Sequence, residues 1–118
     1  MKLLMFPFVI RIGLALVFLA NSLIAFLEPS EFQDLISGSF VENLLPVSVA
    51  TFVSFIGVND LIVAVLLFIG WRTTYVARYA TLWLVGVILV VGAFSIEALE
   101  HLGFLAMALA LAMSERTE

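Results

Sequence analysis

The sequence predicts an all-α fold, an integral membrane bundle of four helices, and two observations point to it. Of the 118 residues, 64% are hydrophobic and only 12% are charged, whereas a typical soluble domain is about 45–50% apolar and about 25% charged. The apolar residues also fall into runs of about 20, the length that crosses a bilayer as a helix. This composition excludes intrinsic disorder and argues against a soluble enzyme.

Four apolar segments are expected to span the membrane and to form one transmembrane domain over residues 1–118. Their approximate bounds are 5–27, 47–70, 74–96 and 98–113. The boundary between the third and fourth segments is the hardest to place, because no proline or glycine lies between residue 96 and Gly103. One helix over 74–113 would be about 60 Å long, roughly twice the hydrocarbon thickness of a bilayer. We therefore predict a tight turn near Ser95–Ala98.

The positions of the basic residues predict the orientation. No Lys or Arg occurs between Arg11 and Arg72 or between Arg78 and Arg116. With four spans, Lys2, Arg72 and Arg116 all lie on one side, and the positive-inside rule makes that side cytoplasmic. Both chain termini are then cytoplasmic in a multi-pass protein of the cell membrane. A cleaved signal peptide is the competing interpretation of the first segment, but Arg11 interrupts its apolar centre.

The first outer loop, residues 28–46, contains a predicted short amphipathic helix. Glu28-Pro29 ends the first span, because a residue before proline avoids the α region, and Ser30 is a suitable N-cap. Apolar residues then recur at helical spacing with acidic residues between them, with a break expected at Gly38. The helix is either a loop packed over the bundle or a lid or docking face for a partner.

Three charged residues inside the apolar segments are the main candidates for function: Arg11, Asp60 and Arg78. Ionisable groups in a bilayer are costly and usually face the protein interior. Counted along their helices, all three are expected to meet in the inner half of the bundle, where two guanidinium groups would hold Asp60 ionised. Asn59 points about 100° away from Asp60 along the helix and is expected to bond a neighbouring helix.

Two interpretations of this charge cluster stay open. It fixes helix register, with the arginines reaching the headgroups, or it forms a ligand or proton site. Asp60 is the best single candidate for function, because its short side chain cannot reach the membrane surface.

A second polar cluster is expected at the outer face, formed by Glu97, Glu100 and His101. One His and two Glu residues are a poor metal set without further ligands, and the chain has no Cys. We expect no metal, and an acidic cap at the start of the fourth helix instead. With only five Lys and Arg residues, nucleic-acid binding is not expected either. No catalytic triad, phosphate loop or dinucleotide fingerprint is present.

The segments RIGLALVFLANSLIAF (11–26), GVNDLIVAVLLFIGWRTTYVARYA (57–80) and LGFLAMALALAM (102–113) together resemble the DoxX-like family of small four-helix bacterial membrane proteins. The resemblance touches Arg11, Asp60, Gly70 and Arg72. The chain departs from the family pattern in lacking a Gly…Lys segment at the end of the first helix, and in having Asp60 where Glu is common. The resemblance implies a four-helix bundle in the bacterial inner membrane and, more weakly, an association with oxidoreductase proteins.

These observations lead to two main hypotheses for function. The first is a non-catalytic membrane subunit or scaffold, working with a membrane or redox protein partner or as a homo-oligomer. Any redox role would require a bound quinone or a partner, because the chain has no Cys; otherwise no cofactor is expected. The second is a binding protein or transporter for a small hydrophobic or cationic ligand, with Asp60 as counter-ion. An enzyme acting on a quinone or a lipid is a third and less favoured hypothesis.

Overall fold

The computed structural model describes the backbone of residues 2–91 and 96–113, and the side chains of residues 7–90, 96 and 99–113. Throughout these residues the regular structure is helical, which confirms the predicted all-α class. The elements are α1 (Lys2–Leu27), α2 (Pro29–Ser37), the 3-10 helix η1 (Phe40–Leu44), α3 (Val49–Ile69), α4 (Thr73–Val91) and α5 (Ile96–Met113).

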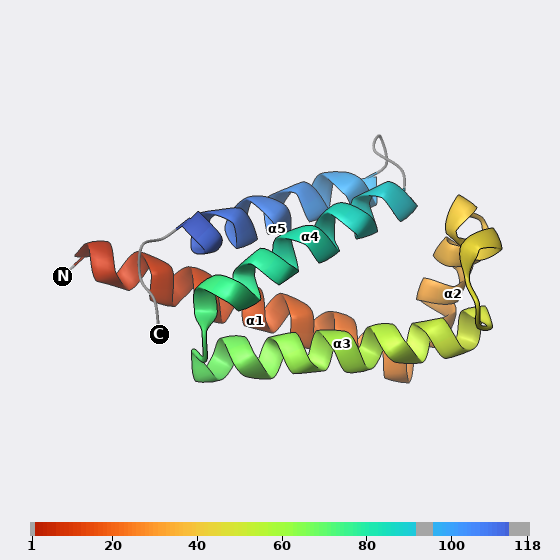
Figure 1. Cartoon of the computed structure of the whole chain (residues 1–118), viewed down its shortest axis with the longest axis horizontal. Helices are drawn as coiled ribbons and strands as arrows, with labels where there is room; N and C mark the ends of the chain where they lie inside the picture. Colours follow the sequence, from red (N-terminus) through yellow and green to blue (C-terminus); the bar gives the residue numbers. More distant parts are fainter. Residues whose placement is uncertain (1, 92–95, 114–118) are drawn as a thin grey trace.

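The long helices form two pairs. α1 packs along α3, and α4 packs along α5 as a helical hairpin that lies across the first pair (Figure 1). α2 and η1 sit together at one end of the molecule, opposite the start of α1 and the end of α5 (Figure 1). The two pairs cross at the α3–α4 turn and diverge toward α2, and this divergence positions the candidate site.

Local sequence explains where α2 and α3 begin. Pro29 is the first residue of α2, where its missing N–H is not needed. Ser48 caps α3: its hydroxyl accepts a hydrogen bond from the backbone N–H of Thr51 at 3.1 Å. The short helix predicted in the first loop is present as α2, and Gly38 follows its last residue as expected. Ser30 is not its N-cap: Pro29 is already the first helical residue, so Glu28 takes the cap position, without a side-chain cap hydrogen bond.

Gly70 ends α3 in the left-handed region, with φ of 83°. The N–H groups of Gly70 and Trp71 both donate to the carbonyl of Leu66, at 2.9 Å and 3.2 Å. This is a Schellman-type ending, and glycine takes the left-handed position without a Cβ penalty. α4 begins three residues later, so α3 and α4 are joined by a very short turn.

The third and fourth predicted segments lie in separate helices, α4 and α5, but residues 96–98, which we assigned to the turn, are helical. α4 ends at Val91 and α5 begins at Ile96, so 96–98 belong to α5 rather than to a turn. Ser95 lies outside the described residues, as does the remainder of the 92–95 connection. The helix propensity of Ile96–Ala98 is sufficient to extend α5 over the positions that we assigned to the turn.

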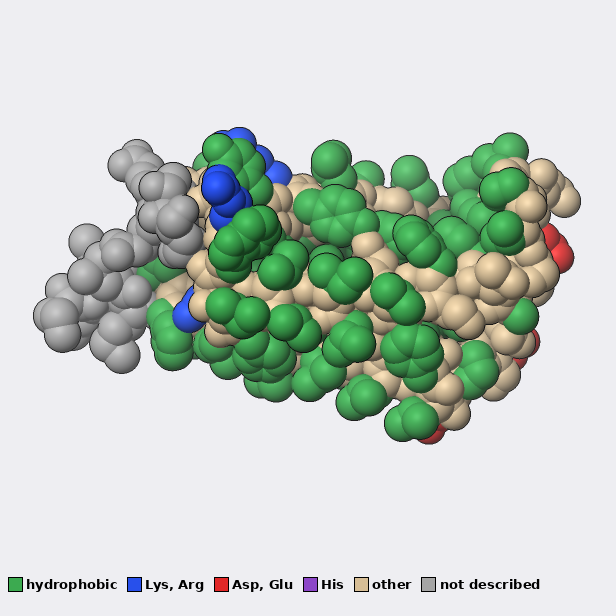
Figure 2. Space-filling model, turned by 60° about the horizontal axis from the view of Figure 1, so that its bottom comes forward, with side chains coloured by type: hydrophobic (Ala, Val, Ile, Leu, Met, Phe, Trp, Pro, Cys, Tyr) green, Lys and Arg blue, Asp and Glu red, His purple; other side chains and the backbone are tan. Residues whose placement is uncertain are grey.

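Among the described residues, three helices are long and apolar enough to cross a membrane: Pro7–Leu27, Val49–Ile69 and Thr73–Val90. The apolar part of α5, Leu99–Met113, is shorter. The 21 residues of α3 extend over roughly 32 Å, close to the hydrocarbon thickness of a bilayer. Large apolar side chains cover the face seen in Figure 2, between an end with Lys and Arg and an end with Asp and Glu.

The main core lies where the two helix pairs cross. Five of its members are alanine, which lets the helix backbones approach closely, as small residues do in membrane bundles. The twelve buried members come from α1, α3, α4 and α5: Leu14, Ala15, Phe18, Val63, Ala64, Leu67, Val76, Ala77, Ala80, Leu84, Ala108 and Leu111. A smaller cluster of Ala25, Ile36 and Val53 fixes α2 on α1 and α3.

Candidate functional site

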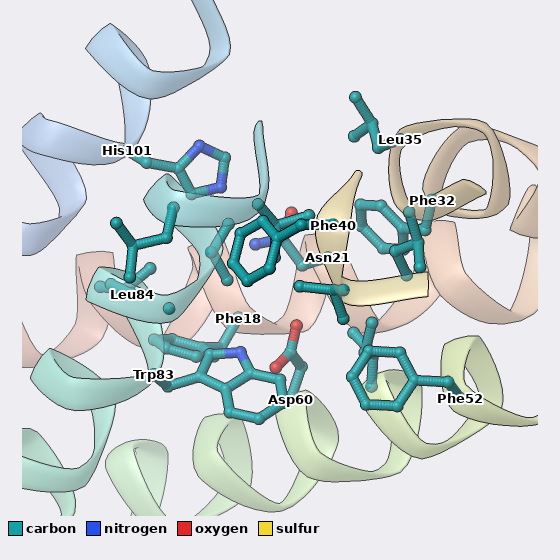
Figure 3. A pocket seen from close by; sticks show the side chains of 17 residues that line it. Phe18, Asn21, Phe32, Leu35, Phe40, Phe52, Asp60, Trp83, Leu84 and His101 are labelled. Atoms are coloured by element: carbon teal, nitrogen blue, oxygen red, sulfur yellow. The ribbon is translucent and has the colours of Figure 1, made fainter. Parts of the chain in front are cut away.

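A cavity of about 350 Å³ lies between the two helix pairs on the side toward α2. Every helix and η1 contributes to its wall, and most of the lining is aromatic or aliphatic. The polar residues in the wall are Asn21, Asp60, Trp83 and His101 (Figure 3). The size and the combination of an apolar wall with a few polar groups are typical of small-molecule sites.

The aromatic part of the wall comes from five different elements. α1 contributes Phe18, α2 and η1 contribute Phe32 and Phe40, α3 contributes Phe52, and α4 contributes Trp83 (Figure 3). α2 turns its apolar side inward, with Ile36 buried, and its acidic residues outward. The amphipathic pattern of this helix therefore reflects its position over the cavity.

The cavity also reaches the molecular surface. Phe40 and Leu89 line it and are each 60% exposed, and Gly86 on the same side of α4 is exposed as well. Gly86 has no heavy atom within 4 Å of the position that a Cβ would take. The cavity is therefore open beside this part of α4, and there is room for a larger side chain at position 86.

Asp60 is the most deeply buried charged residue that the structure describes, with 2% of its surface exposed. It lies near the middle of α3, and its carboxylate is directed into the cavity (Figure 3). The side-chain amide of Asn59 donates to Asp60 Oδ1 at 3.1 Å. The side chain of Trp83 is its second hydrogen-bond partner, through the indole N–H. Both partners are neutral donors from the helices that face each other across this part of the bundle.

Asn59 links this carboxylate to α4. Its side-chain oxygen accepts a hydrogen bond from the hydroxyl of Tyr79 while its NH₂ group donates to Asp60. The amide is therefore held at both ends, which fixes its orientation and that of the carboxylate. The expected bond from Asn59 to a neighbouring helix is present, but its hydrogen bond to Asp60 was not expected, because we placed the two side chains about 100° apart around the helix.

The predicted cluster of Arg11, Asp60 and Arg78 is wrong. The Arg11 guanidinium donates to the backbone carbonyls of Leu67 at 2.9 Å and Phe68 at 3.4 Å. These carbonyls lie at the C-terminal end of α3, two turns from Asp60, or roughly 10 Å along the helix. Helix C-termini leave carbonyls unsatisfied and carry partial negative charge, so they attract a cation as a carboxylate does.

Arg78 is exposed and lies over the ring of Tyr75, with its guanidinium carbon 5.7 Å from the ring centre. It therefore lies on the outward side of α4, whereas Tyr79, the next residue, reaches Asn59. Within the described side chains, neither arginine pairs with Asp60. The interpretation that the arginines fix helix position fits Arg11, which joins α1 to the end of α3.

The predicted outer polar cluster is only partly visible. The side chain of Glu97 lies outside the described residues, and Glu100 is exposed. His101 lines the cavity and packs edge-on against Phe104, with ring centres 5.4 Å apart. Over the side chains of residues 7–90, 96 and 99–113, no three His, Asp or Glu groups come together as a metal would require.

Sequence reasoning missed Trp83 and Tyr79, which contact the central polar groups. A tryptophan in the middle of an apolar helix was an available signal, because a buried indole N–H needs an acceptor. Tyr79 lies four residues before Trp83, a spacing that places both side chains on the same side of α4. The two rings stack, with centres 6.3 Å apart.

Comparison with protein-family models, with curated proteins and with solved structures finds no match to this chain. The resemblance to the DoxX-like family therefore stays a prediction, and any functional conclusion rests on the geometry of the cavity.

Proposed function

We propose that the chain is an integral membrane protein that binds a small, mostly apolar ligand in the central cavity, with Asp60 as the polar anchor. The observation that supports this most strongly is a buried carboxylate in the wall of a 350 Å³ apolar cavity. A carboxylate in such surroundings costs free energy unless it is partnered. The Asp60 carboxylate is buried despite this cost, and Asn59 and Trp83 fix its orientation toward the cavity, as a ligand-binding group requires.

The proposal includes an arrangement in the bilayer: four membrane helices, with both termini and the α3–α4 turn in the cytoplasm of a bacterial cell. Two observations support it. The basic side chains Arg11, Arg72 and Arg78 belong to the end with the α3–α4 turn, and the acidic residues of α2 and η1 belong to the other end (Figure 2). The molecule is 47 Å long, close to the thickness of a bilayer with its headgroups, about 40–45 Å.

A matched pair of glycine variants tests the binding proposal. Gly86→Leu adds a side chain at the cavity wall, where there is open space around the Cβ position. Gly103→Leu makes the same change on α5, also in open space but away from the cavity wall. Each protein is extracted with its native lipids into nanodiscs, and the small molecules that accompany it are identified by mass spectrometry.

The proposal predicts one small molecule that is bound in near-stoichiometric amount by the wild type and by Gly103→Leu, and is lost from Gly86→Leu. No such molecule in the wild type, or the same amount in all three proteins, would contradict it.

A membrane subunit or scaffold is the second candidate. The resemblance to the DoxX-like family favours it, as does the shortness of the segments outside the long helices. The same extraction distinguishes the two candidates. A stoichiometric protein partner retained by Gly86→Leu, with no small molecule in any sample, would support the subunit.

A further inference from the structure

We propose that the cavity takes a lipophilic cation, a small monovalent ammonium-type ion with an apolar body. This inference rests on the proposed binding function and names the chemical class of its ligand. It is carried by three features of the structure: the neutral surroundings of Asp60, the aromatic wall, and the distribution of charge along the molecule.

The first feature is that Asp60 has no cationic partner among the described side chains. Its two hydrogen-bond partners, Asn59 and Trp83, are neutral. The Arg11 guanidinium instead donates to backbone carbonyls of α3, and the Arg78 guanidinium lies over the Tyr75 ring. A carboxylate has about four lone-pair sites, so two donors leave room for a further contact. A cation bound in the cavity would supply the opposite charge that the Asp60 carboxylate lacks.

The second feature is the composition of the wall. Five aromatic side chains line the cavity, and none of the described lining residues is Lys or Arg. The faces of aromatic rings attract cations, and desolvated sites lined by several rings recognise quaternary ammonium groups. Because the rings of Phe18, Phe52 and Trp83 lie around the Asp60 carboxylate (Figure 3), an ammonium group there would meet both kinds of contact. An anion would meet neither.

The third feature is the field of the protein. The α2–η1 end, which lies next to the cavity, carries the exposed carboxylates of Glu28, Glu31, Asp34 and Glu42. A side-chain hydrogen bond with Glu28, together with desolvation and the repulsion between the two groups, raises the pKa of Glu31. Carboxylates this close together produce a negative potential. Such a potential raises the local concentration of cations near the cavity and speeds their association.

The test compares two probes of the same shape that differ in charge. Benzyltrimethylammonium carries one positive charge, and neopentylbenzene is its neutral carbon analogue. The chain has two tryptophans, and Trp71 is exposed at the α3–α4 turn, so Trp71→Phe leaves Trp83 as the only indole reporter in the cavity wall. Binding is followed by Trp83 fluorescence in nanodiscs. The titration is repeated with Asp60→Asn, and with Glu100→Gln as a control at an exposed acid of α5 outside the cavity wall.

The inference predicts that the cation binds at least about tenfold more tightly than the neutral probe. Asp60→Asn removes this difference and leaves the affinity for neopentylbenzene within about twofold. Glu100→Gln leaves the preference for the cation in place. Equal affinities for the two probes, or a preference that survives in Asp60→Asn, would overturn the inference and leave the binding proposal standing. Saturable binding of neither probe would overturn both.

Discussion

The contact between Arg11 and the end of α3 makes a quantitative prediction, because it depends on Gly70. A Cβ at position 70 would collide with the Arg11 guanidinium, and Gly70 also has φ of 83°. Gly70→Ala therefore has two separate costs. The left-handed conformation costs about 1–2 kcal/mol for alanine. Displacing Arg11 removes its hydrogen bond to the Leu67 carbonyl, worth about 1.5 kcal/mol at this partly buried position.

The sum is a loss of about 2.5–3.5 kcal/mol in the free energy of unfolding for Gly70→Ala alone. Arg11→Met removes the same hydrogen bond without touching the turn, so it costs about 1.5 kcal/mol. In the Arg11→Met background, Gly70→Ala then costs only the conformational part, about 1–2 kcal/mol. The two changes are expected to be non-additive by about 1.5 kcal/mol.

The assay is equilibrium unfolding in bicelles by titration with SDS, for the wild type, both single variants and the double variant. Gly13→Ala is the control, because Gly13 lies within α1 and has open space at its Cβ position; we expect it to be neutral or stabilising by up to about 1 kcal/mol. Additivity of the two changes within about 0.5 kcal/mol would refute the role of Arg11 as the cap of α3.

Three further predictions test the packing, the loop and the orientation. Leu84 is 1% exposed in the core, and Leu84→Ala is expected to lower the free energy of unfolding by about 2–4 kcal/mol. Leu82 is 73% exposed, and Leu82→Ala should change the free energy of unfolding little. Equal losses for the two variants would contradict the proposed core. Glu31→Gln should stabilise the protein near neutral pH and lose this advantage on acidification. Because the pKa of Glu31 is raised in the folded state, the wild type gains stability as the pH falls and Glu31 takes up a proton. If thermal unfolding showed the same gain in stability for Glu31→Gln at every pH, this prediction would be contradicted. The chain has no Cys, so single cysteines can report the orientation. Ser37→Cys should react with an impermeant maleimide in intact cells, and Arg72→Cys should react only after lysis. The reverse pattern would show that the protein has the opposite orientation in the membrane.

The parts of the fold that could be predicted from the sequence are those with local signals. Apolar runs gave the long helices to within a few residues, since α3 extends over Val49–Ile69 where we expected 47–70. Pro29 is the first residue of α2, a position that suits its fixed φ, and Gly38 follows the last residue of the helix. Asp60 was correctly placed in the interior, because its burial follows from its position in an apolar run.

The arrangement around Asp60 could not be predicted, because it depends on backbone acceptors and on helix rotation. Arg11 binds carbonyl groups, and every residue has one, so no residue type marks the partner. Arg78 and Tyr79 are adjacent in sequence, and only the rotation of α4 decides which of them faces Asn59. The separation of the two helix pairs, which creates the cavity, depends on the packing at the crossing, where Ala77 and Ala80 lie in one core with Phe18 and Leu84.

The most direct test of the account is a structure determined with 4-bromobenzyltrimethylammonium, whose bromine is located by anomalous scattering. The account predicts a bromine site inside the cavity, with the ammonium group beside the Asp60 carboxylate and the rings of Trp83 and Phe52 around it. It also predicts that the site is absent in Gly86→Leu. Bromine found only on the lipid-facing surface, or a cavity site that persists unchanged in Asp60→Asn, would contradict the central role given to this carboxylate.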